Sequence, residues 1–216
     1  MTEQREIQPG DADVLVVVDI QYDFLPGGAL AVPDGGAVVA PINRLAKAFR
    51  HVVLTQDWHP KGHASFASSH PGRKPFEATE LAYGPQVLWP DHCVQGTPGA
   101  EISRDLDIPH AQLVIRKGYN AGIDSYSGFK EADRRTSTGL DGYLKERGFR
   151  RVFCAGLATD FCVAWTAIDA AAAGFESYLI EDASRAIDAA GSLARARSDW
   201  NAAGVRTIGS GQIREA

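Results

Sequence analysis

Short apolar runs rich in β-branched residues alternate with longer amphipathic segments along most of this chain. Each run is typical of a strand buried on both faces, and each longer segment is typical of a helix that covers such strands. The alternation predicts an α/β fold with an open, mostly parallel sheet of about six strands and helices on both faces. The predicted strands are residues 14–18, 52–55, 112–115, 151–156, 177–180 and 205–208, and the predicted helices are residues 38–49, 140–147, 160–173 and 192–203.

Length and charge narrow the class of protein. The 216 residues suffice for one well-buried core without a linker, so we expect a single domain over residues 1–216. The polar start and the lack of a long apolar segment predict no secretory signal and no membrane span, hence a cytoplasmic location. A net charge of −5 without a long Lys/Arg run argues against nucleic acid or membrane as main partner. We expect a small neutral molecule, and a homo-oligomer stays open.

The cysteines offer one candidate nucleophile. Three cysteines in a chain of this size make a disulfide framework unexpected and leave free thiols. Cys162 falls in the first turn of the helix predicted over residues 160–173, where the helix N-terminus favours a thiolate and can hold an oxyanion. Core packing is the competing interpretation, and Cys154, inside an apolar strand, illustrates it.

Polar residues follow four of the predicted strands. Asp19 follows the first strand, Asp57 and His59 the second, Lys117 the third and Cys162 the fourth. In open parallel sheets, ligands bind outside the carboxyl ends of the strands, so these side chains should face one crevice. A carboxylate there could take the proton of a thiol, and an ammonium could stabilise the thiolate and keep the carboxylate ionised. The aperiodic residues 58–98 are expected to form a functional loop layer.

A metal site is predicted in the same crevice. Asp57 and His59 lie two residues apart, which places both side chains on one side of an extended segment, and His92 supplies a third ligand type. One Asp and two His fit an open, catalytic site for Zn²⁺ or a related divalent metal. His63 is a further candidate ligand. Cys93, as a soft ligand beside His92, is an alternative that we rank below the set of Asp57, His59 and His92. The remaining loop histidines, His51 and His70, have weaker claims.

Taken together, these residues resemble the nicotinamidase/pyrazinamidase group of the isochorismatase-like cysteine hydrolases. The resemblance spans most of the chain and rests on six linked motifs in the order found in that family. They comprise residues 18–24 with 26–30, 55–60 with 63–66, 89–94, 116–118, 124–129 and 156–163. The resemblance implies an isochorismatase-like three-layer sandwich.

The resemblance also implies roles for individual residues. It implies a catalytic triad of Asp19, Lys117 and Cys162, and an oxyanion hole formed by the backbone N–H groups of Ala158 and Cys162, after a cis peptide before Ala158. The metal, Zn²⁺ ahead of Fe²⁺ or Mn²⁺, would be held by Asp57, His59 and His92. Residues matching the walls of the family's ring pocket are Phe24, Leu30, Trp89 and Tyr126, and Phe161 occupies the variable position of the Thr-Asp-x-Cys phrase.

The implied function is that of an amidohydrolase acting on linear amides, a nicotinamidase. It would convert nicotinamide, and also pyrazinamide, to the acid and ammonia through a thioester on Cys162, in NAD salvage. Three alternatives stay open at this point. The same triad could hydrolyse another small amide of the ureido or carbamoyl type, a zinc-bound hydroxide could attack while Cys162 only packs, or the chain could bind metal or nicotinamide without catalysis. The metal, the preference between the two amides and the oligomeric state are not fixed by the sequence.

Overall fold

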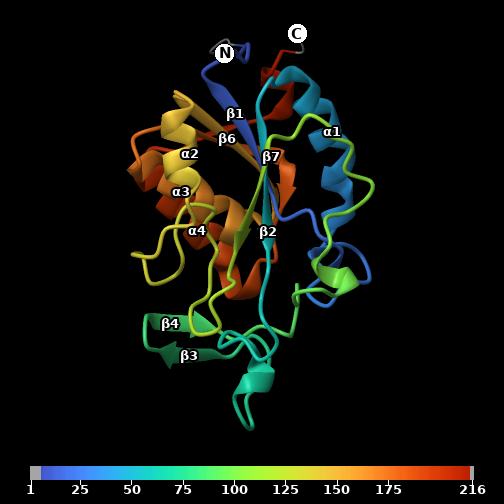
Figure 1. The fold of residues 1–216 in the computed structure, drawn as a ribbon, viewed down its shortest axis with the longest axis vertical. Coiled ribbons are helices and arrows are strands. Elements are labelled where there is room, and N and C mark those ends of the chain that lie inside the picture. Colours follow the sequence, from blue (N-terminus) through green and yellow to red (C-terminus); the bar gives the residue numbers. More distant parts are fainter. Residues whose placement is uncertain (1–5, 215–216) are drawn as a thin grey trace.

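The computed structural model describes residues 6–214, and its arrangement is shown in Figure 1. Residues 1–5, which carry most of the polar start used above to argue against a secretory signal, lie outside the described residues. Within residues 6–214, no helix has the length and apolar character needed to cross a membrane.

A six-stranded sheet forms the centre of the molecule, and all of its pairings are parallel. The strand order is β5-β2-β1-β6-β7-β8. The prediction of an open, mostly parallel sheet of about six strands is therefore confirmed. The strands are β1 (Asp13–Val18), β2 (Val52–Asp57), β5 (Leu113–Lys117), β6 (Arg151–Leu157), β7 (Glu176–Arg185) and β8 (Arg206–Ile208).

Helices cover both faces of the sheet, as predicted. In Figure 1, α1 lies on one side of the sheet, and α2, α3 and α4 lie on the other. The bounds are α1 (Val39–Ala48), α2 (Leu140–Glu146), α3 (Ala164–Ala172) and α4 (Ser192–Ala202). Gly148 and Gly174 adopt positive φ angles of 74° and 95° just after α2 and α3, as is typical of glycine at helix C-termini.

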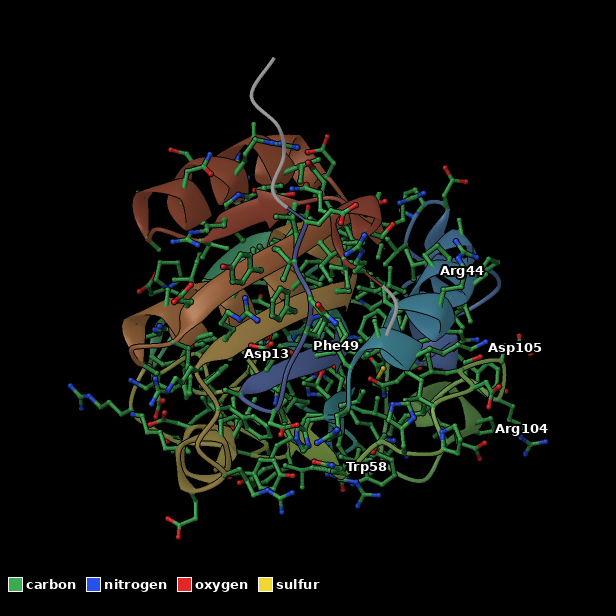
Figure 2. All side chains as sticks on the ribbon, turned by 90° about the horizontal axis from the view of Figure 1, so that it is seen from above. Asp13, Arg44, Phe49, Trp58, Arg104 and Asp105 are labelled. Carbon is green, nitrogen blue, oxygen red and sulfur yellow. The ribbon has the colours of Figure 1, made fainter. Side chains whose placement is uncertain are left out.

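Two hydrophobic cores result from the alternation of side chains along the strands. Leu15 and Val17 of β1 belong to the core beneath α1, whereas Val14 and Val16 belong to the core beneath the other three helices. In the first core, Phe49, labelled in Figure 2, packs edge-to-face on the ring of Phe153 of β6, with 5.0 Å between ring centroids. Burial on both faces explains why these strands read as continuous apolar runs.

Two predicted segments differ from the structure. The predicted helix over residues 160–173 begins with a π-helical turn, Thr159–Val163, and only then continues as α3. The segment 58–98 contains a two-stranded antiparallel hairpin of β3 (Ala78–Leu81) and β4 (Gly84–Val87), which lacks the apolar alternation that would have predicted it. Figure 1 shows this hairpin beyond the carboxyl ends of the sheet strands.

The strand order places a topological switch point between β1 and β6. From β1 the chain builds outward through β2 and β5, and then returns to the opposite side of β1 as β6. Such a switch opens a crevice at the carboxyl ends of the two strands. Asp19 directly follows β1, and the turn bearing Cys162 follows β6.

Candidate active site

Four strand ends converge on one buried group of side chains. The register of β2 and β5 places Asp57 directly opposite Lys117, the last residues of their strands. Asp19 follows β1 with a left-handed φ of 50°, a conformation that is uncommon outside glycine. Asp19 and Lys117 are 0 % exposed and Cys162 is 6 % exposed. The arrangement expected from the strand ends is therefore present.

Lys117 lies at the centre of the group. Its Nζ is 2.8 Å from Asp19 Oδ2 and 3.4 Å from Cys162 Sγ, and it forms an ion pair with Asp57 Oδ1. A further hydrogen bond of 3.1 Å runs from Nζ to the carbonyl oxygen of Ser125. One ammonium therefore touches the predicted base, the predicted nucleophile and a predicted metal ligand.

The charges of this group follow from burial and from the lysine. Burial by itself would lower the pKa of Lys117, but the carboxylates of Asp19 and Asp57 outweigh it, so its pKa lies well above the ordinary value. Burial would raise the pKa of Asp57, but Lys117 together with His59 and His92 outweighs that effect and holds the pKa well below the ordinary value. Lys117 is thus a permanent cation, and Asp57 a permanent anion.

Burial decides the protonation of the thiol. It raises the pKa of Cys162 well above the ordinary value in spite of Lys117, and it also raises the pKa of Asp19 despite the same ammonium. These directions differ from the expectation that the helix start and Lys117 would favour a resting thiolate and that Lys117 would keep the carboxylate of Asp19 ionised. Removal of water from both groups is the physical reason, because it penalises each charged form. The raised pKa makes Asp19 a stronger base for the thiol proton.

Thr55 is a contributor that we did not predict. Its hydroxyl donates a 2.5 Å hydrogen bond to Asp19 Oδ1 and accepts one of 3.2 Å from the backbone N–H of Asp19. Thr55 lies two residues before Asp57 on β2, so the two side chains share one side of the strand. That spacing is a signal which could have identified it.

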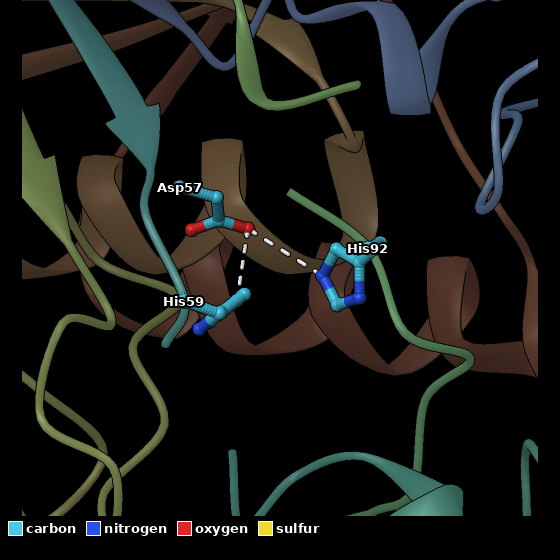
Figure 3. Close-up of side chains that lie close together, drawn as sticks. All are labelled: Asp57, His59 and His92. Atoms are coloured by element: carbon cyan, nitrogen blue, oxygen red, sulfur yellow. Dashed lines mark ion pairs between the residues drawn. The ribbon is translucent and has the colours of Figure 1, made fainter. Parts of the chain in front are cut away.

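The three predicted metal ligands come together beside this group (Figure 3). Asp57 Oδ2 lies 3.6 Å from His59 Nε2 and 3.7 Å from His92 Nε2. Both distances exceed those of a hydrogen bond, and the ligand atoms of all three residues lie within 4.8 Å of one another. The structure thus contains a cluster of ligand atoms that a divalent cation can bind.

The outer nitrogens of both imidazoles are fixed by the backbone. His59 Nδ1 is 2.9 Å from the carbonyl oxygen of Gly118, and His92 Nδ1 is 2.8 Å from that of Pro90. A carbonyl can only accept, so each Nδ1 carries the proton and each Nε2 lone pair is left for a metal. Such carbonyl partners are typical of metal-binding histidines. The donor set therefore fits Zn²⁺ or a related divalent metal.

The Cα atom of Gly118 also lies close against the His59 ring. Its φ is +68°, and a Cβ atom built on it would lie 2.4 Å from His59 Cε1. Only a residue without a side chain fits there. Gly118, the residue that follows Lys117, therefore holds His59 both by a hydrogen bond and by close contact.

The other ligand candidates do not join the cluster of Asp57, His59 and His92. His63 Nε2 lies 2.9 Å from the carbonyl oxygen of Asn120, and its Nδ1 lies 2.7 Å from Ser65 Oγ, so both ring nitrogens already have partners. Among residues 6–214, the groups of ligand atoms do not include Cys93. His63 instead lies beside His59, with 4.4 Å between ring centroids and 42° between the ring planes.

A cavity opens over the thiol and over two of the metal ligands, Asp57 and His92. All four residues expected to wall a ring pocket line it, together with two of the three predicted metal ligands, the two predicted oxyanion residues and three further residues. The four are Phe24, Leu30, Trp89 and Tyr126, the next group is Asp57, His92, Ala158 and Cys162, and the three additions are Asp124, Phe161 and Ile187. Phe161 stands edge-on to Trp89, with 5.0 Å between centroids, so the variable position forms part of the wall.

The backbone around Ala158 matches what the resemblance implied. The peptide bond between Leu157 and Ala158 is cis. The carbonyl of Ala158 accepts the N–H groups of Phe161 and Val163, each at 3.1 Å, whereas within residues 6–214 its own N–H has no hydrogen-bond acceptor. The role of Ala158 and Cys162 in an oxyanion hole stays a prediction.

The hairpin contributes one buried side chain to the site. Gln86 of β4 donates to Asp124 Oδ2 at 2.7 Å and to the hydroxyl of Tyr126 at 3.0 Å. Trp89 Nε1 donates to the same hydroxyl at 3.1 Å, and Asp124 Oδ1 lies 4.0 Å from His59 Nε2. No spacing signal marks Gln86, because it acts through partners about 40 residues away in an aperiodic segment.

Comparisons with known proteins agree with this geometry. The model of the family described as "Isochorismatase domain" matches residues 13–208. A nicotinamidase of Acinetobacter baylyi is 58% identical over 199 residues, which are 92% of this chain and 93% of that protein. A solved structure of an Acinetobacter baumanii nicotinamidase/pyrazinamidase has a TM-score of 0.92 and 57% identity, and covers 94% of this chain and 98% of its own.

A second similar structure holds a metal. The pyrazinamidase of Pyrococcus horikoshii, solved in complex with zinc, has a TM-score of 0.75 and 35% identity, with coverage of 92% of this chain and 99% of its own. The similarity extends over nearly the whole length of all three proteins. With a family model that matches all six strands of the sheet, the chain belongs to the isochorismatase-domain family.

Proposed function

We propose that this protein is a nicotinamidase, an amidohydrolase that converts nicotinamide, and also pyrazinamide, to the acid and ammonia. The observation that carries the proposal is the meeting of three features: a cavity lined by Cys162, the Lys117 ammonium 3.4 Å from its sulfur, and a three-ligand metal cluster of which Asp57 and His92 line the same cavity. Relatives named nicotinamidase and a relative named nicotinamidase/pyrazinamidase support this choice of substrate. The activity would serve NAD salvage in the cytoplasm, carried out by one hydrolase domain over residues 1–216.

The chain's own residues would divide the reaction as follows. Asp19 takes the proton of the Cys162 thiol as the sulfur attacks the amide carbonyl carbon, and Lys117 stabilises the negative charge that passes between them. The N–H groups of Ala158 and Cys162 hold the developing oxyanion, and one such donor contributes about 3 kcal/mol. Asp19 then passes its proton to the amide nitrogen, the carbon–nitrogen bond breaks to release ammonia, and the acyl group remains on sulfur as a thioester.

The second half of the reaction uses the same carboxylate. Asp19 accepts a proton from water, the water oxygen attacks the thioester carbonyl, and the carbon–sulfur bond breaks to release the acid and the thiol. A base that serves twice must sit close to the sulfur, and Asp19 and Cys162 offer ligand-type atoms within 4.8 Å of each other. The raised pKa of Asp19 suits this alternation between acid and base.

Asp57, His59 and His92 would hold the metal, for which we propose Zn²⁺ ahead of Fe²⁺ and Mn²⁺. When bound, it would supply a Lewis-acidic partner for the ring nitrogen and so orient the carboxamide toward Cys162. The zinc complex of the similar pyrazinamidase supports zinc. The walls formed by Phe24 and Trp89 would then confine the flat ring from its sides.

Ammonia release from nicotinamide tests the proposal. We expect the metal-loaded wild type to turn over, and Cys162→Ala to lose at least about a thousandfold in kcat, because the nucleophile is gone. Cys154→Ala is the matched control, since Cys154 is a buried thiol within β6 and should leave kcat unchanged. Chelation should lower activity, and adding back Zn²⁺, Fe²⁺ or Mn²⁺ singly ranks the metals.

Three results would overturn it. Metal-loaded wild type that releases no ammonia from either amide, but turns over a ureido or carbamoyl compound, would assign another substrate. Retention of most turnover by Cys162→Ala would instead indicate attack by metal-bound hydroxide. Binding of nicotinamide without turnover of any amide would indicate a binding module.

A further inference from the structure

Asp160 is a buried carboxylate that the proposed mechanism does not use. It lies in the π-helical turn Thr159–Val163, two residues before Cys162, and is 4 % exposed. A carboxylate buried to this extent must have its oxygens satisfied by hydrogen bonds or by a cation. Its partners show what it does.

All three of its partners lie on one distant segment, residues 186–192, which we call the strap. Asp160 Oδ1 accepts the backbone N–H of Ile187 at 3.0 Å, and Oδ2 accepts the backbone N–H of Asp188 at 2.8 Å. The hydroxyl of Ser192, the first residue of α4, also donates to Oδ2. Hydrogen bonds to an ionised acceptor are about twice as strong as neutral ones. One side chain thus fastens the strap at three points.

Apart from Asp160, two hydrogen bonds from α4 hold the strap: the N–H of Leu193 donates to Asp188 Oδ1 at 3.2 Å, and Arg195 donates to the carbonyl of Ala190 at 2.8 Å. Asp188, Ala190 and Gly191 have left-handed φ angles of 51°, 49° and 75°, and left-handed backbone in non-glycine residues persists only where surrounding structure enforces it. Ile187, the residue held through Oδ1, lines the same cavity as Cys162. The position of this wall therefore depends on the turn that carries the nucleophile.

We propose that Asp160 is a positioning residue, which fastens the strap so that Ile187 closes the cavity wall beside Cys162. The inference rests on the proposed function, since it takes the cavity to be the amide-binding site. Asn cannot replace Asp160, because both carboxylate oxygens accept hydrogen bonds from the strap. In Asn one of these oxygens becomes an NH₂ group, which is a donor and would face another donor. Loosening the strap would admit water and reagents to the thiol and leave the substrate ring less confined.

The test compares Asp160→Asn with two partner variants. Ser192→Ala removes one of the three donors, and Ile187→Ala removes the wall but keeps both backbone bonds and the charge. Asp169→Asn is the matched control: Asp169 is 3 % exposed, lies on α3, and accepts two hydrogen bonds from Arg134 rather than from the strap. Alkylation of Cys162 by iodoacetamide, followed by mass spectrometry, and KM and kcat for nicotinamide are measured on each variant.

We expect Asp160→Asn to raise the alkylation rate and KM about tenfold, with a smaller change in kcat, because a charged hydrogen bond that holds the wall is lost. Ile187→Ala should change both quantities in the same direction, Ser192→Ala should change them less, and Asp169→Asn should match the wild type. Equal alkylation rates and KM for Asp160→Asn and Asp169→Asn would overturn the proposal. An increased alkylation rate in Asp160→Asn together with a wild-type alkylation rate in Ile187→Ala would also overturn it, since the cause would then be the lost charge and not a moved wall.

The two proposals fail separately. If the wild type releases no ammonia from nicotinamide, the proposed function fails, while the alkylation rates of the same four variants still decide whether Asp160 holds the strap. Should Asp160→Asn not fold, Ser192→Ala and Ile187→Ala carry the test, and wild-type alkylation rates in both would refute it.

Discussion

Replacing Lys117 with Met should destabilise the protein strongly. The ammonium is 0 % exposed and pairs with two buried carboxylates, those of Asp19 and Asp57. Removing one partner of a buried ion pair costs about 3–5 kcal/mol, because the remaining charge has lost its compensation. In a domain of this size, each kcal/mol corresponds to about 2–4 °C, so we expect the melting temperature to fall by about 6–20 °C.

Thermal and urea unfolding, followed by circular dichroism on metal-free protein, measure this cost. Lys145→Met is the matched control, since Lys145 is half exposed on α2, pairs with Asp141 one turn away, and should lose about 0.5 kcal/mol or less. Adding Zn²⁺ should narrow the gap between Lys117→Met and wild type, because the metal supplies Asp57 with another cation. If metal-free Lys117→Met lies within about 1 kcal/mol of wild type, Lys117 is not the counter-charge of two buried carboxylates and the reasoning is refuted.

Three further variants separate the parts of the site. Thr55→Val removes the hydroxyl bound to Asp19 and should lower kcat/KM about tenfold to a hundredfold without changing zinc affinity by calorimetry; unchanged kcat/KM would contradict it. His92→Asn should weaken zinc binding by at least about tenfold yet leave the alkylation rate of Cys162 near wild type, and unaltered zinc affinity would exclude His92 as a ligand. Gln86→Leu leaves the hydroxyl of Tyr126 short of one donor, and should cost about 1–3 kcal/mol of unfolding free energy in urea; a loss below about 0.5 kcal/mol would count against that network.

The sheet and its covering helices were predictable because burial on both faces leaves continuous apolar runs in the sequence. The start of the helix after β6 was not, since the turn Thr159–Val163 is π-helical and no propensity distinguishes its residues from the α-helix that follows. The hairpin of β3 and β4 escaped as well. Its strands are four residues each, one contains Gly84 and Pro85, and their exposed residues do not alternate with apolar ones.

The site divides in a similar way. Asp19, Lys117 and Cys162 were within reach of sequence reasoning because each lies at or just beyond the end of a strand, and a parallel sheet brings those ends together. Gln86 was not, because it carries no motif and acts on partners about 40 residues away. Asp160 lies in the Thr-Asp-x-Cys phrase, but its role depends on partners 27 or more residues away, which the phrase does not show. The protonation of Cys162 could not be predicted from the sequence either, since the pKa of its thiol depends on how completely the fold excludes water.

Lys117 and Gly118 are adjacent at the end of β5, yet they contact different parts of the site. The lysine contacts the acid–base pair, while the glycine carbonyl and its bare Cα fix the first metal ligand, His59. Adjacent residues on one strand end thus serve the two functions. A substitution of the glycine would disturb metal loading and, through the shared backbone, the lysine. We therefore expect a side chain at residue 118 to lower zinc affinity and the rate of amide hydrolysis together, although Gly118 is neither a metal ligand nor a member of the triad.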